Sequence, residues 1–138
     1  MQRDPEQGIE VRVSVEPADL EVSGDPERIH QVVANLLENA IRHSPTSGSV
    51  TVRATARGGQ VSIEVQDQGP GILPEDTDRV FERFYRAYRA RSSTDGGSGL
   101  GLSIARWIVD LHGGAIRAEP NRPRGTRMVV SLPGGMGR

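Results

Sequence analysis

The chain of 138 residues has the length of a single domain, carries a formal net charge of -1 and contains no cysteine. The absence of cysteine excludes disulfides, thiol nucleophiles and thiolate metal sites, and the near-neutral charge excludes the basic footprint of a nucleic-acid-binding protein. No apolar run is long enough to cross a membrane and no signal-peptide pattern is present, so we expect no membrane span within these residues.

The first part of the chain predicts a strand and then an amphipathic helix. Apolar and polar residues alternate over 9–15, after a polar lead-in over 1–8, and a second short strand is expected over 20–22. Asp25 and Pro26 then provide an N-cap and a first-turn proline. The core face of the predicted helix combines apolar residues at helical spacing: Ile29, Val32, Val33, Leu36, Leu37, Ala40 and Ile41.

The rest of the chain groups its strands between helices. The predicted elements are strands over 50–54 and 61–65, a short helical piece around 81–88 within a long loop, a helix over 100–112, and strands over 115–118 and 126–132. The core face of the second helix is predicted at Leu100, Ile104, Ile108 and Leu111, and His112 is expected to help end it. This grouping favours an α+β sandwich, with one mixed sheet and helices on one face. The domain is expected to span 9–132, followed by a tail over 133–138.

Two asparagines border the apolar face of the first predicted helix. Asn35, Asn39 and Arg42 follow one another at spacings of four and three residues and therefore share a stripe. Asparagine is a poor helix former because its amide competes for backbone groups. The pair could be ordinary amides on the helix surface, or a polar stripe on a pocket wall, where amide oxygens can ligate Mg²⁺ shared with nucleotide phosphates.

A carboxylate and two glycines follow the strand predicted over 61–65. The segment from Asp67 through Gly69 to Gly71 has the composition of a loop that a ligand can approach closely. Asp67 could accept a hydrogen bond from a ligand amine, or it could cap an ordinary Gly-Pro turn.

A glycine-rich loop over 96–102 leads into the second predicted helix. Bare backbone N–H groups beside a helix N-terminus favour a bound phosphate. The loop lacks the Lys-Ser/Thr ending of a P-loop and lies far from the first strand, where a Rossmann glycine motif belongs. Both of those nucleotide-binding folds are therefore excluded.

Four of the five aromatic residues lie between these two loops. The patch could be a small helix that packs its aromatics on the core. It could instead belong to a mobile lid over about 73–98 that carries an arginine to phosphates and aromatics to a partner. The aromatics follow helical spacing and arginines accompany them: Phe81, Phe84, Tyr85, Tyr88, Arg79, Arg83 and Arg86.

These segments together resemble the catalytic and ATP-binding domain of sensor histidine kinases, in the wider GHKL family of gyrase-type ATPases and Hsp90-type chaperones. The resemblance covers about 9–132 and implies a Bergerat fold, an α+β two-layer sandwich of one mixed, mostly antiparallel sheet and about three helices, with a mobile ATP lid. Four motifs occur in the family's order: an N box at 35–43, a G1 box at 67–71, an F box at 81–86 and a G2 box at 97–102.

The resemblance implies that the first two motifs bind ATP or ADP with Mg²⁺. Asn39 would ligate the Mg²⁺ ion, while Asn35 and Arg42 would lie near the phosphates. Asp67 would bind the adenine amine. His43 fills a position that in relatives often carries an aromatic residue packed on the adenine or ribose.

The resemblance also assigns the remaining motif residues. Gly69 and Gly71 would let the lid hinge, and Arg86 could approach the terminal phosphate. The G2 box would wrap the phosphates through Gly97, Ser98, Gly99, Leu100, Gly101 and Leu102.

Two departures from relatives shape the expected activity. Asn35 stands where gyrase-type relatives carry a glutamate that activates water, and a neutral amide cannot act as a general base, so little ATP hydrolysis is expected. None of the three histidines lies in the family's phosphoacceptor box. The acceptor histidine is therefore expected on a separate dimerisation domain of the same protein.

By the same resemblance, phosphate would pass on to a response regulator. The domain would be cytoplasmic and monomeric in isolation, in a full-length protein anchored in the cell membrane, with no nucleic-acid partner. An anti-sigma-factor Ser/Thr kinase, another small GHKL ATPase and a non-catalytic nucleotide-binding module remain as alternatives.

Overall fold

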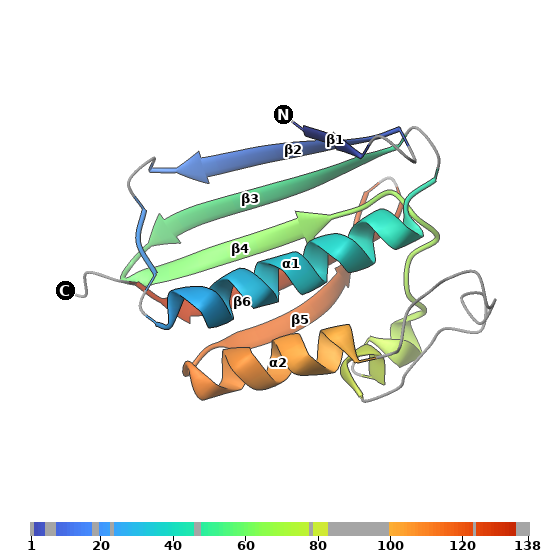
Figure 1. Ribbon diagram of the computed structural model, residues 1–138. Coiled ribbons are helices and arrows are strands. Elements are labelled where there is room, and N and C mark those ends of the chain that lie inside the picture. The colour runs from blue at the N-terminus through green and yellow to red at the C-terminus, as the bar shows by residue number, and fades with distance from the viewer. Residues whose placement is uncertain are drawn as a thin grey trace.

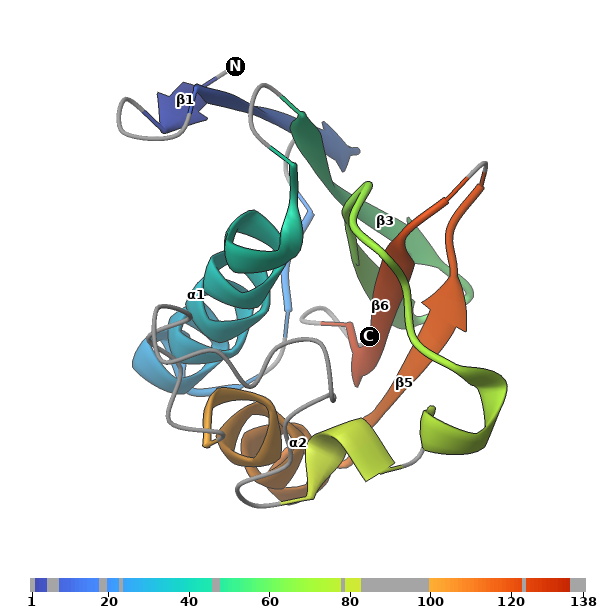
Figure 2. The same cartoon turned by 90° about the vertical axis from the view of Figure 1, so that its right-hand side faces the viewer.

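A six-stranded sheet forms one layer of the protein, and two α-helices cover one of its faces (Figures 1 and 2). The computed structural model describes residues 2–4, 8–17, 20–22, 24–45, 48–77, 79–82, 100–122 and 124–134. The strands are β1 (Gln2–Asp4), β2 (Ile9–Glu16), β3 (Ser49–Arg57), β4 (Gln60–Gln66), β5 (Ala115–Pro120) and β6 (Thr126–Pro133). The helices are α1 (Pro26–His43) and α2 (Gly101–Leu111), with 3-10 turns η1 (Pro74–Asp76) and η2 (Arg79–Phe81).

The sheet is mixed and mostly antiparallel, which confirms the predicted fold class. Its strand order is β1-β2-β3-β4-β6-β5, and only the β2–β3 pair among the described strands is parallel. In the parallel pair α1 makes the crossover, since it lies between β2 and β3 in the chain. Neither helix among the described residues is both long and apolar enough to span a bilayer.

Helix α1 begins where the sequence predicts. The Asp25 carboxylate accepts a hydrogen bond from the backbone N–H of Glu27 at 3.0 Å, and Pro26 occupies the first turn, where its missing N–H is not needed. The helix buries one stripe of side chains against the sheet: Val32, Leu36 and Ala40.

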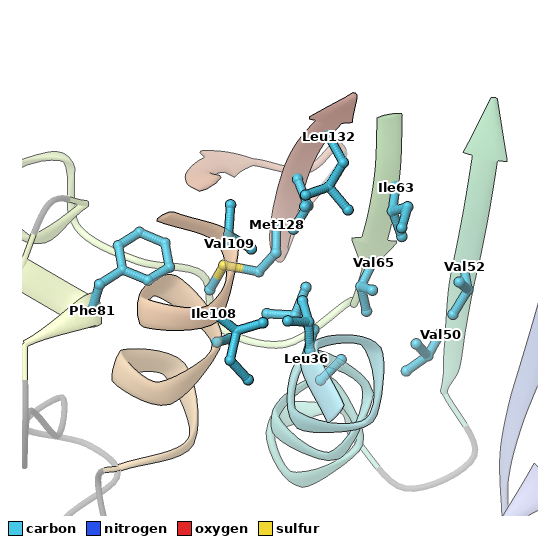
Figure 3. Close-up of a cluster of buried hydrophobic side chains, with 14 of the residues drawn as sticks. Leu36, Val50, Val52, Ile63, Val65, Phe81, Ile108, Val109, Met128 and Leu132 are labelled. Atoms are coloured by element: carbon cyan, nitrogen blue, oxygen red, sulfur yellow. The ribbon is translucent and has the colours of Figure 1, made fainter. Parts of the chain in front are cut away.

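The core lies between the helices and one face of the sheet. The inward residues of β3 and β4 alternate with outward polar ones, as the pleat of a strand requires, while β6 also buries Val129 on the other face. Figure 3 shows these side chains meeting Leu36 of α1, Ile108 and Val109 of α2 and Phe81 of η2. The sheet contributes Val50, Val52, Ile63, Val65, Met128 and Leu132.

Helices α1 and α2 run antiparallel, and His112 connects the end of α2 to the beginning of α1 (Figure 1). His112, which follows α2, has its Nδ1 2.8 Å from the Ile108 carbonyl oxygen, while its Nε2 accepts from the backbone N–H of Asp25 at 3.2 Å. The prediction that His112 helps to end its helix is confirmed, and the same ring reaches the N-cap of α1. Near this connection, the Arg28 guanidinium lies 5.8 Å from the Trp107 ring centre.

Several predicted details differ in the structure. The strand expected over 20–22 is reduced to one bridge between Val22 and Gly134, and the lead-in over 1–8 contains β1. Leu111, predicted on the core face of α2, is 65% exposed, because α2 turns Ala105, Ile108 and Val109 inward instead.

The expected helical piece around 81–88 is described only at its start, where η2 ends at Phe81, and residues 83–88 lie outside the described part of the chain. Strand β6 extends to Pro133, which was predicted to be the first residue of the tail.

Candidate functional site

Asp67 is a buried carboxylate at the end of β4. Its side chain is 3% exposed, and its Oδ1 accepts hydrogen bonds from the backbone N–H of Gly69 at 2.8 Å and of Thr126 at 3.2 Å. The first bond comes from the turn that follows β4 and the second from the start of β6. The carboxylate is therefore fixed by two segments that meet only in the folded chain.

The second carboxylate oxygen of Asp67 has a different environment. No hydrogen bond reaches Oδ2 from the part of the chain that the structure describes. Burial raises the pKa of the Asp67 carboxyl above its ordinary value, while the N–H groups of Gly69 and Thr126 and the charge of His43 oppose the rise. Oδ2 is not among the fully enclosed polar atoms of the described chain, so it can still be reached from outside. An acceptor oxygen of this kind is suited to a hydrogen bond from a ligand.

Glycines permit the close packing around Asp67. A Cβ at Gly69 would collide with the His43 carbonyl oxygen at the end of α1, so no larger residue fits between α1 and this loop. Gly71 has a φ of 86°, and a Cβ there would lie 3.3 Å from the Gly125 carbonyl oxygen. The loop thus passes between α1 on one side and the β5–β6 turn on the other.

The β5–β6 turn, residues 121–125, also belongs to the site, although its sequence predicted only a turn. The Asn121 side chain donates from Nδ2 to the Asp67 carbonyl oxygen at 2.8 Å, and Arg124 donates from Nε to the Gly69 carbonyl oxygen at 3.2 Å. Gly125 has a φ of 105°, and a Cβ there would collide with the Asp67 carbonyl. The sequence did show a turn rich in Asn, Pro, Arg and Gly, but its contacts join residues more than fifty positions apart.

Asn35 connects α1 to the beginning of α2. Its Nδ2 donates to the Gly101 carbonyl oxygen at 3.1 Å. The N-cap residue of α2, Leu100, has no side-chain acceptor, so it does not cap the N–H groups of the first turn. Gly101 is exposed, and a Cβ there would meet no other described residue within 4 Å. The helix therefore presents its positive end beside α1.

Asn39, Arg42 and His43 lie farther along α1 and are all half-buried. From Asn35, the helix carries this stripe one and then two turns toward Gly69. The Asn39 amide makes no hydrogen bond with other described residues, so its oxygen is available to a ligand. No group of three or more His, Cys, Asp or Glu side chains that could hold a metal occurs in the described segments.

Some of the remaining predicted site residues are described by the structure, and others lie outside its described residues. Leu102 is partly buried and packs against the core, so its side chain serves the fold, while Leu100 accepts through its carbonyl from Ser103 Oγ at 2.9 Å. Phe81 of the F box is 6% exposed and packs in the core, 6.0 Å from the Arg106 guanidinium. Arg86, Gly97, Ser98 and Gly99 lie outside the described residues.

The described site residues gather at one end of the fold. The C-terminal ends of β4 and α1, the N-terminal end of α2 and the β5–β6 turn all lie on the right-hand side of Figure 1. A family model described as "Histidine kinase-, DNA gyrase B-, and HSP90-like ATPase" matches residues 24–135, which include all of these segments. The chain belongs to this ATPase family.

Within the family, the chain is similar to sensor histidine kinases. It is 43% identical over 125 residues to the sensor-like histidine kinase SenX3 of Mycobacterium tuberculosis, covering 91% of this chain and 30% of the relative. The mycobacterial sensor histidine kinase MprB superposes with a TM-score of 0.80 at 39% identity, covering 92% of this chain and 83% of that one.

A third similar structure is histidine kinase ThkA in complex with response regulator protein TrrA. Its TM-score is 0.77 at 31% identity, covering 94% of this chain and 35% of that one. The chain spans less than a third of SenX3, so it corresponds to the catalytic and ATP-binding domain of a GHKL histidine kinase and not to the whole of such a protein.

Proposed function

We propose that this domain binds ATP with Mg²⁺ and transfers the γ-phosphoryl group to a histidine on a separate phosphoacceptor domain. The observation that carries the proposal is the buried Asp67 carboxylate, whose Oδ1 is occupied by two backbone N–H groups while Oδ2 has no donor among the described residues. An exocyclic amine of adenine is a donor of the required kind. We call the surroundings of Asp67, Gly69 and Gly125 the adenine end of the site.

The phosphates would lie at the other end of the site, between α1 and α2. The uncapped first turn of α2 offers backbone N–H groups and a positive helix end to an anion. Asn35 holds this turn beside α1 through its bond to the Gly101 carbonyl, and Arg42 adds a cation to the same stripe of α1. We call Asn35, Asn39 and the first turn of α2 the phosphate end. Gly97, Ser98, Gly99 and Arg86 would complete it.

The donor set fits Mg²⁺ held jointly by protein and nucleotide. Mg²⁺ usually keeps several waters and takes few protein ligands in addition to substrate phosphates. Asn39 offers one amide oxygen with no partner in the described chain, and no cluster of acidic or imidazole ligands is needed. The ion, when bound, would neutralise charge on the phosphate oxygens.

The chain's own residues position the nucleotide and supply no base to water. Asn35 is a neutral amide whose Nδ2 is already bonded to Gly101, so it cannot take a proton from water. ATP would persist until the acceptor imidazole attacks the γ-phosphorus and the bond to the ADP oxygen breaks. The base that takes the imidazole proton would come from the acceptor domain. This domain would contribute positioning of the nucleotide and charge stabilisation.

In the whole protein, the phosphoacceptor domain and a response regulator would be the partners. The ThkA–TrrA complex, formed by a similar kinase, supports a response regulator as the second partner. We also propose that the domain is cytoplasmic and that the full-length protein is anchored in the cell membrane through other segments.

Phosphoryl transfer can be tested with the separately produced phosphoacceptor domain of the same protein. With γ-labelled ATP, we expect acid-labile phosphohistidine on that domain and little free phosphate without it. Asp67→Asn should stop the labelling, while Asp110→Asn, an exposed position on α2, should not. Acid-stable phosphoserine or phosphothreonine, or rapid phosphate release without an acceptor, would instead favour an anti-sigma kinase or an ATPase.

A further inference from the structure

The β5–β6 turn is hydrogen-bonded to the loop that carries Asp67. It contacts this loop on the side that faces away from α1. Asn121 donates to the Asp67 carbonyl at 2.8 Å, and Arg124 donates to the Gly69 carbonyl at 3.2 Å. The turn is itself closed by a bond of 3.0 Å from the Asn121 backbone N–H to the Gly125 carbonyl. Two peptide carbonyls of the adenine end, two residues apart, are thus bound to one short turn.

Sterics enforce the same arrangement. Gly125 packs so closely on Asp67 that a Cβ would collide with the Asp67 carbonyl, and a Cβ at Gly69 would collide with the His43 carbonyl across the loop. Because the loop is confined on both sides, a change in the turn moves Asp67. The Asp67 backbone N–H also donates to the carbonyl of Thr126, the residue that follows the turn, at 2.9 Å.

We infer that the β5–β6 turn is a positioning element for base selection, with Asn121 as its main side chain. This inference rests on the proposed function. Asn121 acts through Asp67: its bond to the Asp67 carbonyl fixes the peptide that directs the carboxylate toward the adenine amine. Arg124 contributes less, because it is exposed and its bond is longer.

The test uses the 138-residue chain with Asn121→Ala and the isosteric Asn121→Asp, which removes the donor and retains the shape. Arg122→Ala is the matched control, since Arg122 is an exposed neighbour with no hydrogen bond to other described residues. Calorimetric titration with ADP and with GDP is the first measurement. We expect ADP affinity to fall about three- to tenfold, the factor for one net hydrogen bond, and GDP affinity to change little, because guanine has a carbonyl in place of the adenine amine.

Amide hydrogen exchange without nucleotide is the second measurement. Asn121→Ala should speed exchange at Gly69 about three- to tenfold over exchange at central residues of β4. Equal losses for ADP and GDP, uniformly faster exchange, or values within twofold of Arg122→Ala would overturn the inference.

Asp67→Asn separates the two proposals. If Asp67→Asn lowers ADP affinity about 10- to 100-fold while both Asn121 variants bind like the control, only the role of the turn is wrong. If Asp67→Asn itself binds ADP like the unmodified chain, the proposed function fails, and the inference fails with it.

Discussion

The adenine end and the phosphate end of the site are built differently. At the adenine end, a Cβ on Gly125 would collide with backbone, and Asp67 is 3% exposed with Oδ1 bonded from two directions. At the phosphate end, a Cβ on Gly101 would meet no other described residue within 4 Å, and the Asn39 amide has no partner among the described residues. Within the described part of the chain, one end is preformed, whereas the other leaves polar groups to a ligand.

This difference suggests a division of labour. A preformed end can select the base, because its donors and acceptors are fixed before the ligand arrives. An open end can accept phosphates and a metal in different states, as an enzyme that binds ATP and releases ADP requires. Changes at the two ends should therefore have separable effects on base selectivity and on metal dependence.

The packing of the adenine end can be broken with Gly125→Ala. The new methyl group would collide with the Asp67 carbonyl at a position with a φ of 105°, so we expect a loss of about 3 kcal/mol or more in the free energy of unfolding. Gly58→Ala is the matched control, since its φ is 60° and a Cβ would meet nothing within 4 Å. It should cost about 1–2 kcal/mol. Urea unfolding measures both, and equal losses would contradict the close packing.

The chemistry of the adenine end can be removed with Asp67→Asn. The amide would retain the acceptor for Gly69 and Thr126 but point a donor at the adenine amine, so ADP affinity should fall about 10- to 100-fold. The raised pKa means that ionised Asp67 costs stability at neutral pH, so the neutral variant should unfold at an equal or higher urea concentration. Lost binding together with lost stability would point to misfolding instead.

The metal dependence of the phosphate end is expected to reside in Asn39. Asn39→Ala should weaken ADP binding at least about tenfold in Mg²⁺, the lower range for disturbing a metal site, and much less in EDTA. The neighbouring exposed residue on α1 gives the control Glu38→Ala. A variant that keeps the full difference between Mg²⁺ and EDTA would exclude Asn39 as a ligand.

The connection between the helices predicts a smaller effect. Asn35→Ala removes the bond to the Gly101 carbonyl, worth about 0.5–1.5 kcal/mol. Phosphoryl transfer to the acceptor domain should slow about three- to tenfold, with ADP selectivity over GDP unchanged. A change in base selectivity would mean that the two ends are not independent.

The pH dependence gives the mildest test. Because burial raises the pKa of Asp67, the carboxylate protonates at a higher pH than an exposed aspartate as the solution is acidified. ADP affinity should therefore decline with falling pH through that raised pKa. Asp67→Asn should lack this decline while retaining any contribution from the phosphates. Identical profiles for the two proteins would contradict the assignment.

Local pattern was enough to predict most of the fold. The cap at Asp25, the apolar stripe of α1 and the alternation in β3, β4 and β6 are each encoded by neighbouring residues, and the structure has these elements close to the predicted bounds. The face of α2 was predicted less well. Apolar residues of α2 occur on several faces of the helix, so local sequence does not define its buried face. Packing against α1 and the sheet decides that Val109 is buried and Leu111 exposed.

The candidate site was also predicted only in part from local sequence patterns. Asp67 and the asparagines stand in motifs that the sequence makes visible. The grip of Asn121 and Gly125 on Asp67 depends on β4 and β6 lying side by side, which no local pattern encodes. The sequence showed only the turn composition of residues 121–125, because the burial of Thr126 and the positive φ of Gly125 are visible only in the structure.

A crystal structure of the domain with Mg²⁺ and a non-hydrolysable ATP analogue tests the central claim most directly. The account predicts the adenine amine within hydrogen-bond distance of Asp67 Oδ2, the phosphates at the first turn of α2, and Asn39 ligating the ion. An analogue bound elsewhere, or with its base remote from Asp67, would contradict it.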